Sequence, residues 1–154
     1  MDLVTTTAAW LHLLATVMLV GYYLVLVLIV MPAIRQLGAA QPVQIIAILE
    51  RRAMPMLIGS LVVLLATGVY LLTGNGRYAG PGNVGGTWAT LLLVKHVLIV
   101  GMLALGSYLD GLIVRAAAEA GPSELSLTRI VSAFRAMAVL GAAVLLLTSV
   151  VQAA

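Results

Sequence analysis

Three short segments, which hold most of the polar residues, divide the chain into four long apolar stretches. A bilayer has a hydrocarbon core about 30 Å thick, and a helix needs roughly 20 apolar residues to cross it. The apolar stretches cover about residues 8–34, 53–72, 87–114 and 130–151. Because only helices and closed barrels satisfy their backbone in lipid, this pattern predicts an all-α polytopic membrane protein, a four-transmembrane-helix bundle.

The composition supports this prediction and excludes several kinds of chemistry. The sequence of 154 residues is 63% hydrophobic and 8% charged, whereas soluble domains carry about 25% charged residues. We therefore expect the lipid bilayer to be the main partner and residues 1–154 to form a single transmembrane domain without a soluble one. Cysteine is absent, which excludes disulfides, thiolate metal sites and cysteine nucleophiles.

The segments between the apolar stretches are predicted to be loops. The first, Arg35 to Arg52, contains an apolar run over 43–49 that favours a short interfacial helix. The second, Thr73 to Gly86, is rich in glycine and predicts an extramembrane loop. The third runs from Arg115 to Arg129. Pro55 then falls in the first turn of the second helix, where proline is tolerated because that N–H has no helical partner.

The arginines indicate the orientation of the bundle. Only Arg77 falls beside the second loop, and six arginines fall on the side of the first and third loops: Arg35, Arg51, Arg52, Arg115, Arg129 and Arg135. The positive-inside rule then predicts that both termini are external. We expect a multi-pass protein of the cell inner (plasma) membrane. The net charge of +3 is explained by these topology signals, so no nucleic-acid partner is inferred.

Ionisable residues within the apolar stretches need an explanation, because each costs about 2.5–3.5 kcal/mol on insertion scales. His12 lies in the first stretch and the Lys95-His96 pair in the third. The first and third helices run in the same direction, so these side chains lie toward the external face. Their depths differ by roughly 6–7 Å at 1.5 Å per residue, a difference that side chains on facing helices can bridge.

Two histidines on neighbouring helices are a typical axial-ligand pair for a b-type haem in a bundle. His12 and His96 are the predicted metal ligands, and Lys95 is a further candidate cofactor-binding residue. At 100° per residue, His96 and Asp110 share one stripe of the third helix, while Lys95 and Met102 share the adjacent stripe. Both stripes cannot face lipid. The catalytic residues, if there are any, are not identified.

Structural explanations remain open for the same residues. His12 is near enough to the surface to be an interfacial histidine, and Lys95 is long enough to extend its amine to the external headgroups. Asp110 is left out of the site, because pairing with Arg115 or Arg135, which would hold the third helix against the fourth, explains it better than a proton relay does.

Two other functions remain open. The first is copper handling or transport by the same histidines with Met18 or Met102, because thioether sulfur is a soft ligand for Cu(I). The sequence shows no methionine cluster beyond Met54-Pro55-Met56, and scattered methionine is ordinary packing. The second is a cofactor-free accessory subunit of a larger membrane complex, and a homo-oligomer also remains open.

Several short motifs resemble those of a known family. The run Trp10-Leu11-His12-Leu13-Leu14-Ala15, followed by Gly21 and Met31-Pro32-Ala33, resembles the opening helix of the copper-resistance D (CopD) membrane proteins. Glu50-Arg51-Arg52, then Ala66-Thr67-Gly68-Val69-Tyr70, and later Trp88 with Leu92-Leu93-Val94-Lys95-His96, are similar in order and spacing to that family's next two helices.

The same helices are similar to the HemJ-type protoporphyrinogen oxidases, a related four-helix group. In that group a histidine of the first helix and a lysine of the third are implicated around a b-type haem, which by motif implies His12 and Lys95. This sequence departs from the pattern in having His96 directly after the lysine and in lacking richer polar loops. The resemblance implies a haem or copper site, electron transfer or porphyrin redox chemistry, and, if the protein is an enzyme, a haem-dependent membrane oxidoreductase.

Overall fold

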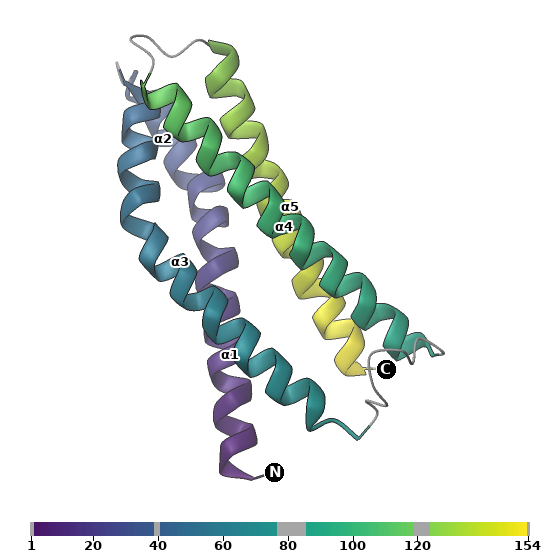
Figure 1. Cartoon of the computed structure of the whole chain (residues 1–154). Coiled ribbons are helices and arrows are strands. Elements are labelled where there is room, and N and C mark those ends of the chain that lie inside the picture. Colours follow the sequence, from purple (N-terminus) through teal and green to yellow (C-terminus); the bar gives the residue numbers. More distant parts are fainter. Residues whose placement is uncertain (1, 39–40, 77–85, 119–123, 154) are drawn as a thin grey trace.

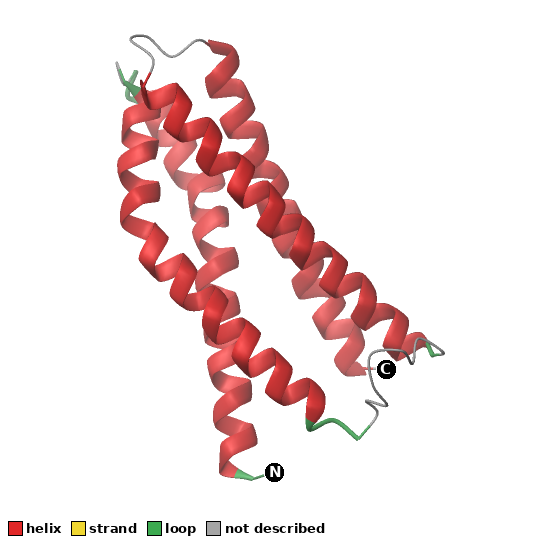
Figure 2. Ribbon diagram, viewed as in Figure 1, coloured by secondary structure: helices red, strands yellow, loops and turns green. Residues whose placement is uncertain are grey.

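The described residues form a bundle of long helices in which no strand occurs (Figures 1 and 2). The computed structural model describes residues 2–38, 41–76, 86–118 and 124–153. The helices are α1 (Leu3–Val25), η1 (Leu26–Val30), α2 (Met31–Gln36), α3 (Pro42–Thr73), α4 (Thr87–Ala118) and α5 (Glu124–Ala153). Since α1, η1 and α2 run on as one helix, the described residues contain four helices long and apolar enough to cross a membrane, as the sequence predicts.

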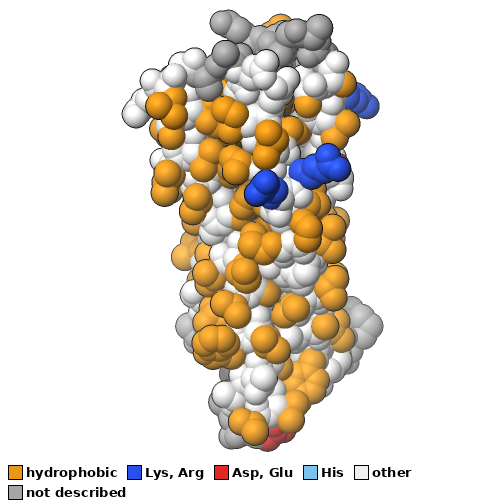
Figure 3. Space-filling view, turned by 90° about the vertical axis from the view of Figure 1, so that its left-hand side faces the viewer, with side chains coloured by type: hydrophobic (Ala, Val, Ile, Leu, Met, Phe, Trp, Pro, Cys, Tyr) orange, Lys and Arg blue, Asp and Glu red, His pale blue; other side chains and the backbone are white. Residues whose placement is uncertain are grey.

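The outer surface has the character of a protein surrounded by lipid. Large apolar side chains are widely exposed, such as Leu28 at 67%, Val139 at 68% and Leu146 at 68%, and soluble monomers rarely expose so much contiguous apolar surface. In Figure 3, basic side chains gather in the upper part of the face shown, and the belt below them is hydrophobic or uncharged. The chain therefore has the features of a multi-pass membrane protein.

The helix boundaries differ from the predicted spans at the arginine-rich end. The segment Arg35 to Arg52, predicted to be a loop, is mostly helical, because α3 already begins at Pro42. Hydropathy indicates where lipid ends, but a helix that makes its own backbone bonds continues beyond that level. Pro55 consequently lies inside α3 and not in its first turn. It removes one helical hydrogen bond, a common cause of bends, and α3 bends along its course (Figure 1).

The first helix widens into one π-helical turn, η1, just before Pro32. A proline ring collides with the carbonyl four residues earlier, and a wider turn relieves that collision. The N–H of Met31 accordingly donates to the carbonyl of Leu26, five residues back. At its start, α1 is capped by the Asp2 carboxylate, which accepts from the N–H groups of Val4 and Thr5. The turn at Gly38 has a φ of 58°, which glycine adopts without strain.

The helices pack as two pairs, α1 with α3 and α4 with α5, and the two pairs meet through α1 with α5 and α3 with α4. The first helix begins and the last ends at the same end of the bundle (Figure 1). We call this end the His12 half: the first halves of α1 and α4 with the second halves of α3 and α5. The opposite end is the arginine half. Arg77 and the centre of the third predicted loop lie outside the described residues.

The hydrophobic core lies mainly in the arginine half. It is built around the fully buried side chains of Phe134, Ile46, Leu109, Ile130 and Val43. In the His12 half, by contrast, no described residue is buried over 2–14, 61–76, 89–101 or 145–150. Figure 1 shows the two helix pairs diverging toward that end. The chain therefore closes tightly around itself at one end only.

Gly141 provides a test of how the two pairs are held together. A Cβ there would lie 3.0 Å from Cγ1 of Val20 on α1. Val20 is 4% exposed, and a β-branched side chain in a helix has one preferred rotamer, so it has little freedom to move away. We expect Gly141→Ala to lower the free energy of unfolding in detergent by about 1–3 kcal/mol. The matched control Gly101→Ala, where a Cβ would meet nothing within 4 Å, is expected to be neutral or stabilising; equal losses would contradict the close contact.

Candidate functional site

His12 projects from α1 toward α3, where the hydroxyl of Thr67 holds it. The distance from Nδ1 of His12 to Oγ1 of Thr67 is 2.9 Å. That hydroxyl donates its own hydrogen to the carbonyl of Val63, at 2.6 Å, so it accepts from the imidazole. Hydrogen bonding therefore assigns the proton to Nδ1 and leaves the Nε2 lone pair unprotonated. A histidine held in this way is ready to bind a metal through Nε2.

Gly68 allows the imidazole to approach α3 closely. A Cβ at this position would lie 3.3 Å from Cε1 of His12 and 3.8 Å from its Nδ1. The ring thus rests directly on the helix backbone, beside the hydroxyl that fixes its rotation. From the sequence, Gly68 is predicted to allow close approach of helices, which this contact confirms, whereas Thr67 appears only as part of a family motif. A hydroxyl followed by a small residue on the helix facing a membrane histidine is the signal that would have identified them.

Lys95 approaches His12 from the other helix pair. It lies on the stripe of α4 that contains the buried Met102, and its side chain is partly buried. The structure places His12 and Lys95 in the same half of the bundle, on helices of different pairs. Of the two stripes of α4, the one with Lys95 faces the bundle.

His96 lies on the other stripe and is exposed. Its Nδ1 is 2.7 Å from the carbonyl oxygen of Leu92 in the same helix, so this ring nitrogen donates to its own backbone. One residue along a helix turns the side chain by about 100°. His96 therefore points in a different direction from Lys95. Asp110, on the same stripe as His96, is also exposed.

The donor atoms in the His12 half can be compared with what a porphyrin and a bare metal ion require. Among the described residues there is no group of three or more His, Cys, Asp or Glu side chains that could hold a metal. A haem iron takes four nitrogens from its own macrocycle and needs the protein only for axial ligands. Of the methionines considered for copper, Met102 is buried in the hydrophobic core and Met18 is exposed on α1. His12 with Lys95 is therefore a donor set that fits haem.

A second polar centre lies in the arginine half, and the sequence reasoning missed it. Glu50 on α3 is 5% exposed, and its carboxylate accepts a hydrogen bond of 2.5 Å from the hydroxyl of Tyr22 on α1. The ring of Tyr22 meets that of Tyr23 edge to face, with centroids 5.2 Å apart. The charge of Asp110 on α4 also acts on Glu50. Glu50 was assigned to a loop, although its spacing from Ile46 and Leu57 on the buried face of α3 indicates an inward position.

Comparison with known protein families, with curated proteins and with solved structures finds no match to this chain. The geometry of the two polar centres and the packing around them are therefore the basis for proposing a function.

The bond between Tyr22 and Glu50 provides a test of the second centre. Tyr22→Phe removes the donor and leaves a buried carboxyl group without this partner, which costs about 1–3 kcal/mol. We expect the free energy of unfolding in detergent to fall by this amount. The control Tyr108→Phe alters a side chain that is 56% exposed on α4 and is expected to have little effect. A stability of Tyr22→Phe equal to that of the unmodified protein would show that the bond is not formed.

Proposed function

We propose that this protein is a haem-binding integral membrane protein of the CopD/HemJ type. It holds a b-type haem in the His12 half and serves electron transfer or porphyrin redox chemistry. The observation that carries the proposal is the environment of His12, whose Nδ1 is bonded to Thr67 while Nε2 is left for a ligand. It is supported by the packing, because His12 stands at the end of the bundle where no described residue is buried over 2–14, 61–76, 89–101 or 145–150.

His12 is the first axial ligand in this proposal, and Lys95 is the favoured second. Lys95 comes from the opposite helix pair and lies in the same half of the bundle. His96 is the alternative second ligand, but it would have to leave the carbonyl of Leu92 and turn toward the bundle. A lysine amine would bind iron as the neutral base, so binding would release its proton.

The bound haem would supply a one-electron couple. The chain's own residues do the rest. Thr67 fixes the tautomer and rotation of the imidazole, Gly68 leaves room for the ring against α3, and the apolar helices keep water from the site. The chain contains no cysteine, which excludes thiolate ligation. The candidate ligands His12, Lys95 and His96 would all bind iron through nitrogen.

The orientation follows from the arginines. The arginines among the described residues all lie in the arginine half. The first helix begins, and the last helix ends, in the opposite half. The positive-inside rule puts the arginine half toward the cytoplasm. Both termini and the haem then face the external side of the cell inner membrane, where an electron donor or acceptor in that compartment has access to the site.

An absorption spectrum of detergent-purified protein, air-oxidised and then reduced with dithionite, tests the proposal. We expect a Soret band that shifts and sharpens on reduction, and its loss in His12→Ala. In Lys95→Ala, we expect the band to shift because the second ligand changes. The control His96→Ala is expected to keep the spectrum of the unmodified protein.

A metal assay on the same sample distinguishes the haem proposal from the two alternative functions. A colourless protein with stoichiometric copper would support copper handling and overturn the haem proposal. A colourless protein without metal that copurifies with other membrane proteins would support an accessory subunit, and also overturns it. A haem spectrum lost in His96→Ala but not in Lys95→Ala would retain haem and reassign the second ligand.

Thr67→Val is a finer test, because it preserves the side-chain shape and removes the hydroxyl that orients His12. Loss of such a partner of a ligating histidine typically lowers affinity about 10–100-fold, and we expect this loss in haem titrations of apoprotein. The matched control is Thr73→Val, whose hydroxyl donates only to its own helix, to the carbonyl of Val69. Equal haem affinity in the two variants would contradict the role assigned to Thr67.

A further inference from the structure

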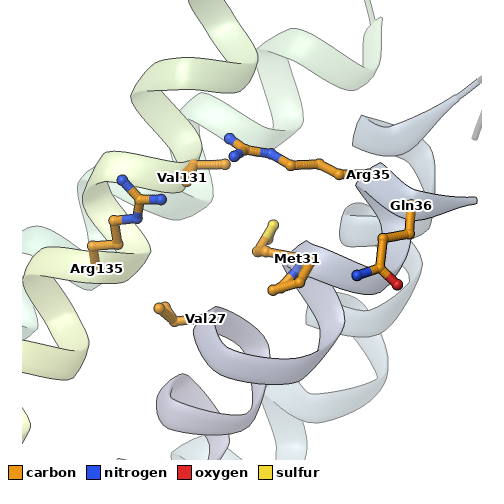
Figure 4. A pocket seen from close by; sticks show the side chains of 7 residues that line it. Val27, Met31, Arg35, Gln36, Val131 and Arg135 are labelled. Carbon is orange, nitrogen blue, oxygen red and sulfur yellow. The ribbon is translucent and has the colours of Figure 1, made fainter. Parts of the chain in front are cut away.

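A pocket opens between the first helix and α5 in the arginine half (Figure 4). Its volume is about 260 Å³. The residues that line it come from η1, α2 and α5: Val27, Met31, Pro32, Arg35, Gln36, Val131 and Arg135. It lies beside the π-helical turn, which shifts the side chains that follow it relative to a regular helix. Neither polar centre described above contributes to it.

Two guanidinium groups on different helices meet at this pocket. In Figure 4, Arg35 extends from α2 toward Val131 on α5, and Arg135 extends into the same space from α5 itself. Both side chains are exposed. No acidic residue is among the described residues that line the pocket, and the buried Glu50 is bonded to Tyr22. Two positive charges therefore share a site that contains no described carboxylate.

The rest of the lining is apolar. Val27, Met31 and Val131 form a hydrophobic surface next to the two arginines, and the amide of Gln36 adds a further donor. A site for a small hydrophilic anion does not need such a wall. An anion attached to a hydrocarbon chain does, because the chain must be removed from water together with its headgroup.

The depth of the pocket agrees with a headgroup level. A helix of 32 residues, such as α3, is about 48 Å long and exceeds a hydrocarbon core of about 30 Å. The arginines therefore need not lie at the tips of the helices to reach the interface. On the face in Figure 3, the basic side chains lie in the upper part of the molecule, with hydrophobic side chains both above and below them. Basic pockets between transmembrane helices on the cytoplasmic side are known to bind anionic lipid headgroups.

We propose that this pocket binds one anionic phospholipid of the inner leaflet, with its phosphate between Arg35 and Arg135 and an acyl chain along Val27 and Val131. Arginine suits this ligand because its planar fork donates two parallel hydrogen bonds to phosphate oxygens. The lipid joins the first helix to α5 at the level where the two helix pairs meet. Its binding does not depend on haem, so it can be tested on the protein without a cofactor.

The test is native mass spectrometry of the full chain in detergent, equilibrated with equal amounts of phosphatidylglycerol and phosphatidylcholine. We expect one tightly retained phosphatidylglycerol per chain. In the double variant Arg35→Gln with Arg135→Gln, we expect its affinity to fall at least about tenfold, because two charge-assisted bonds are lost. The control is Arg51→Gln with Arg115→Gln, which removes the same charge at the same end from exposed residues outside the pocket, and should retain the lipid.

Separate arms with inorganic phosphate and glycerol 3-phosphate distinguish a lipid from a soluble anion. If either displaces phosphatidylglycerol at comparable concentration, the acyl chain contributes nothing and the lipid assignment is wrong. Equal retention of phosphatidylcholine, or equal losses in the two double variants, would also overturn it. Circular dichroism of each variant shows whether a loss of lipid binding is caused by unfolding. If it is, the single variants Arg35→Lys and Arg135→Lys, which keep the charge, take the place of the double variant in the comparison.

Discussion

The hydrocarbon core of a bilayer contains no water, and this constraint determines which polar groups the chain can keep. Backbone groups are satisfied within the helices. Side chains must find partners on a neighbouring helix or on their own carbonyls, as Thr16 and Thr148 do. Polar contacts that cross between helices join His12 to Thr67 and Tyr22 to Glu50. Both join α1 to α3, so this pair is fixed in register at two heights, one in each half of the bundle.

The two halves divide the tasks of stability and binding. The arginine half buries a core around Phe134 and Leu109 and brings the helix pairs together. In the His12 half, no described residue is buried over 2–14, 61–76, 89–101 or 145–150, and the helix pairs diverge toward that end (Figure 1). In our proposal the haem takes the place of the missing core, so that loading it completes the packing as well as the chemistry.

Much of the fold follows from hydropathy, but helix ends and side-chain partners do not. The four apolar helices were predicted because twenty apolar residues in lipid have few alternatives to a helix. The helix over 43–49 was predicted, but Glu50 was assigned to a loop, because hydropathy does not show that this helix continues without a break into the next span. His12 and Lys95 were selected because buried ionisable groups are costly. The partner Thr67 lies 55 residues from His12, a pairing that only the packing of α1 on α3 reveals.

If the loosely packed His12 half holds the cofactor, amide hydrogen exchange should differ between the apoprotein and the haem-loaded protein. We expect haem to slow exchange in peptides from the first half of α1, the second half of α3 and the first half of α4, while peptides around Phe134 stay unchanged. Protection centred on the arginine half, or none anywhere despite bound haem, would contradict this placement of the haem.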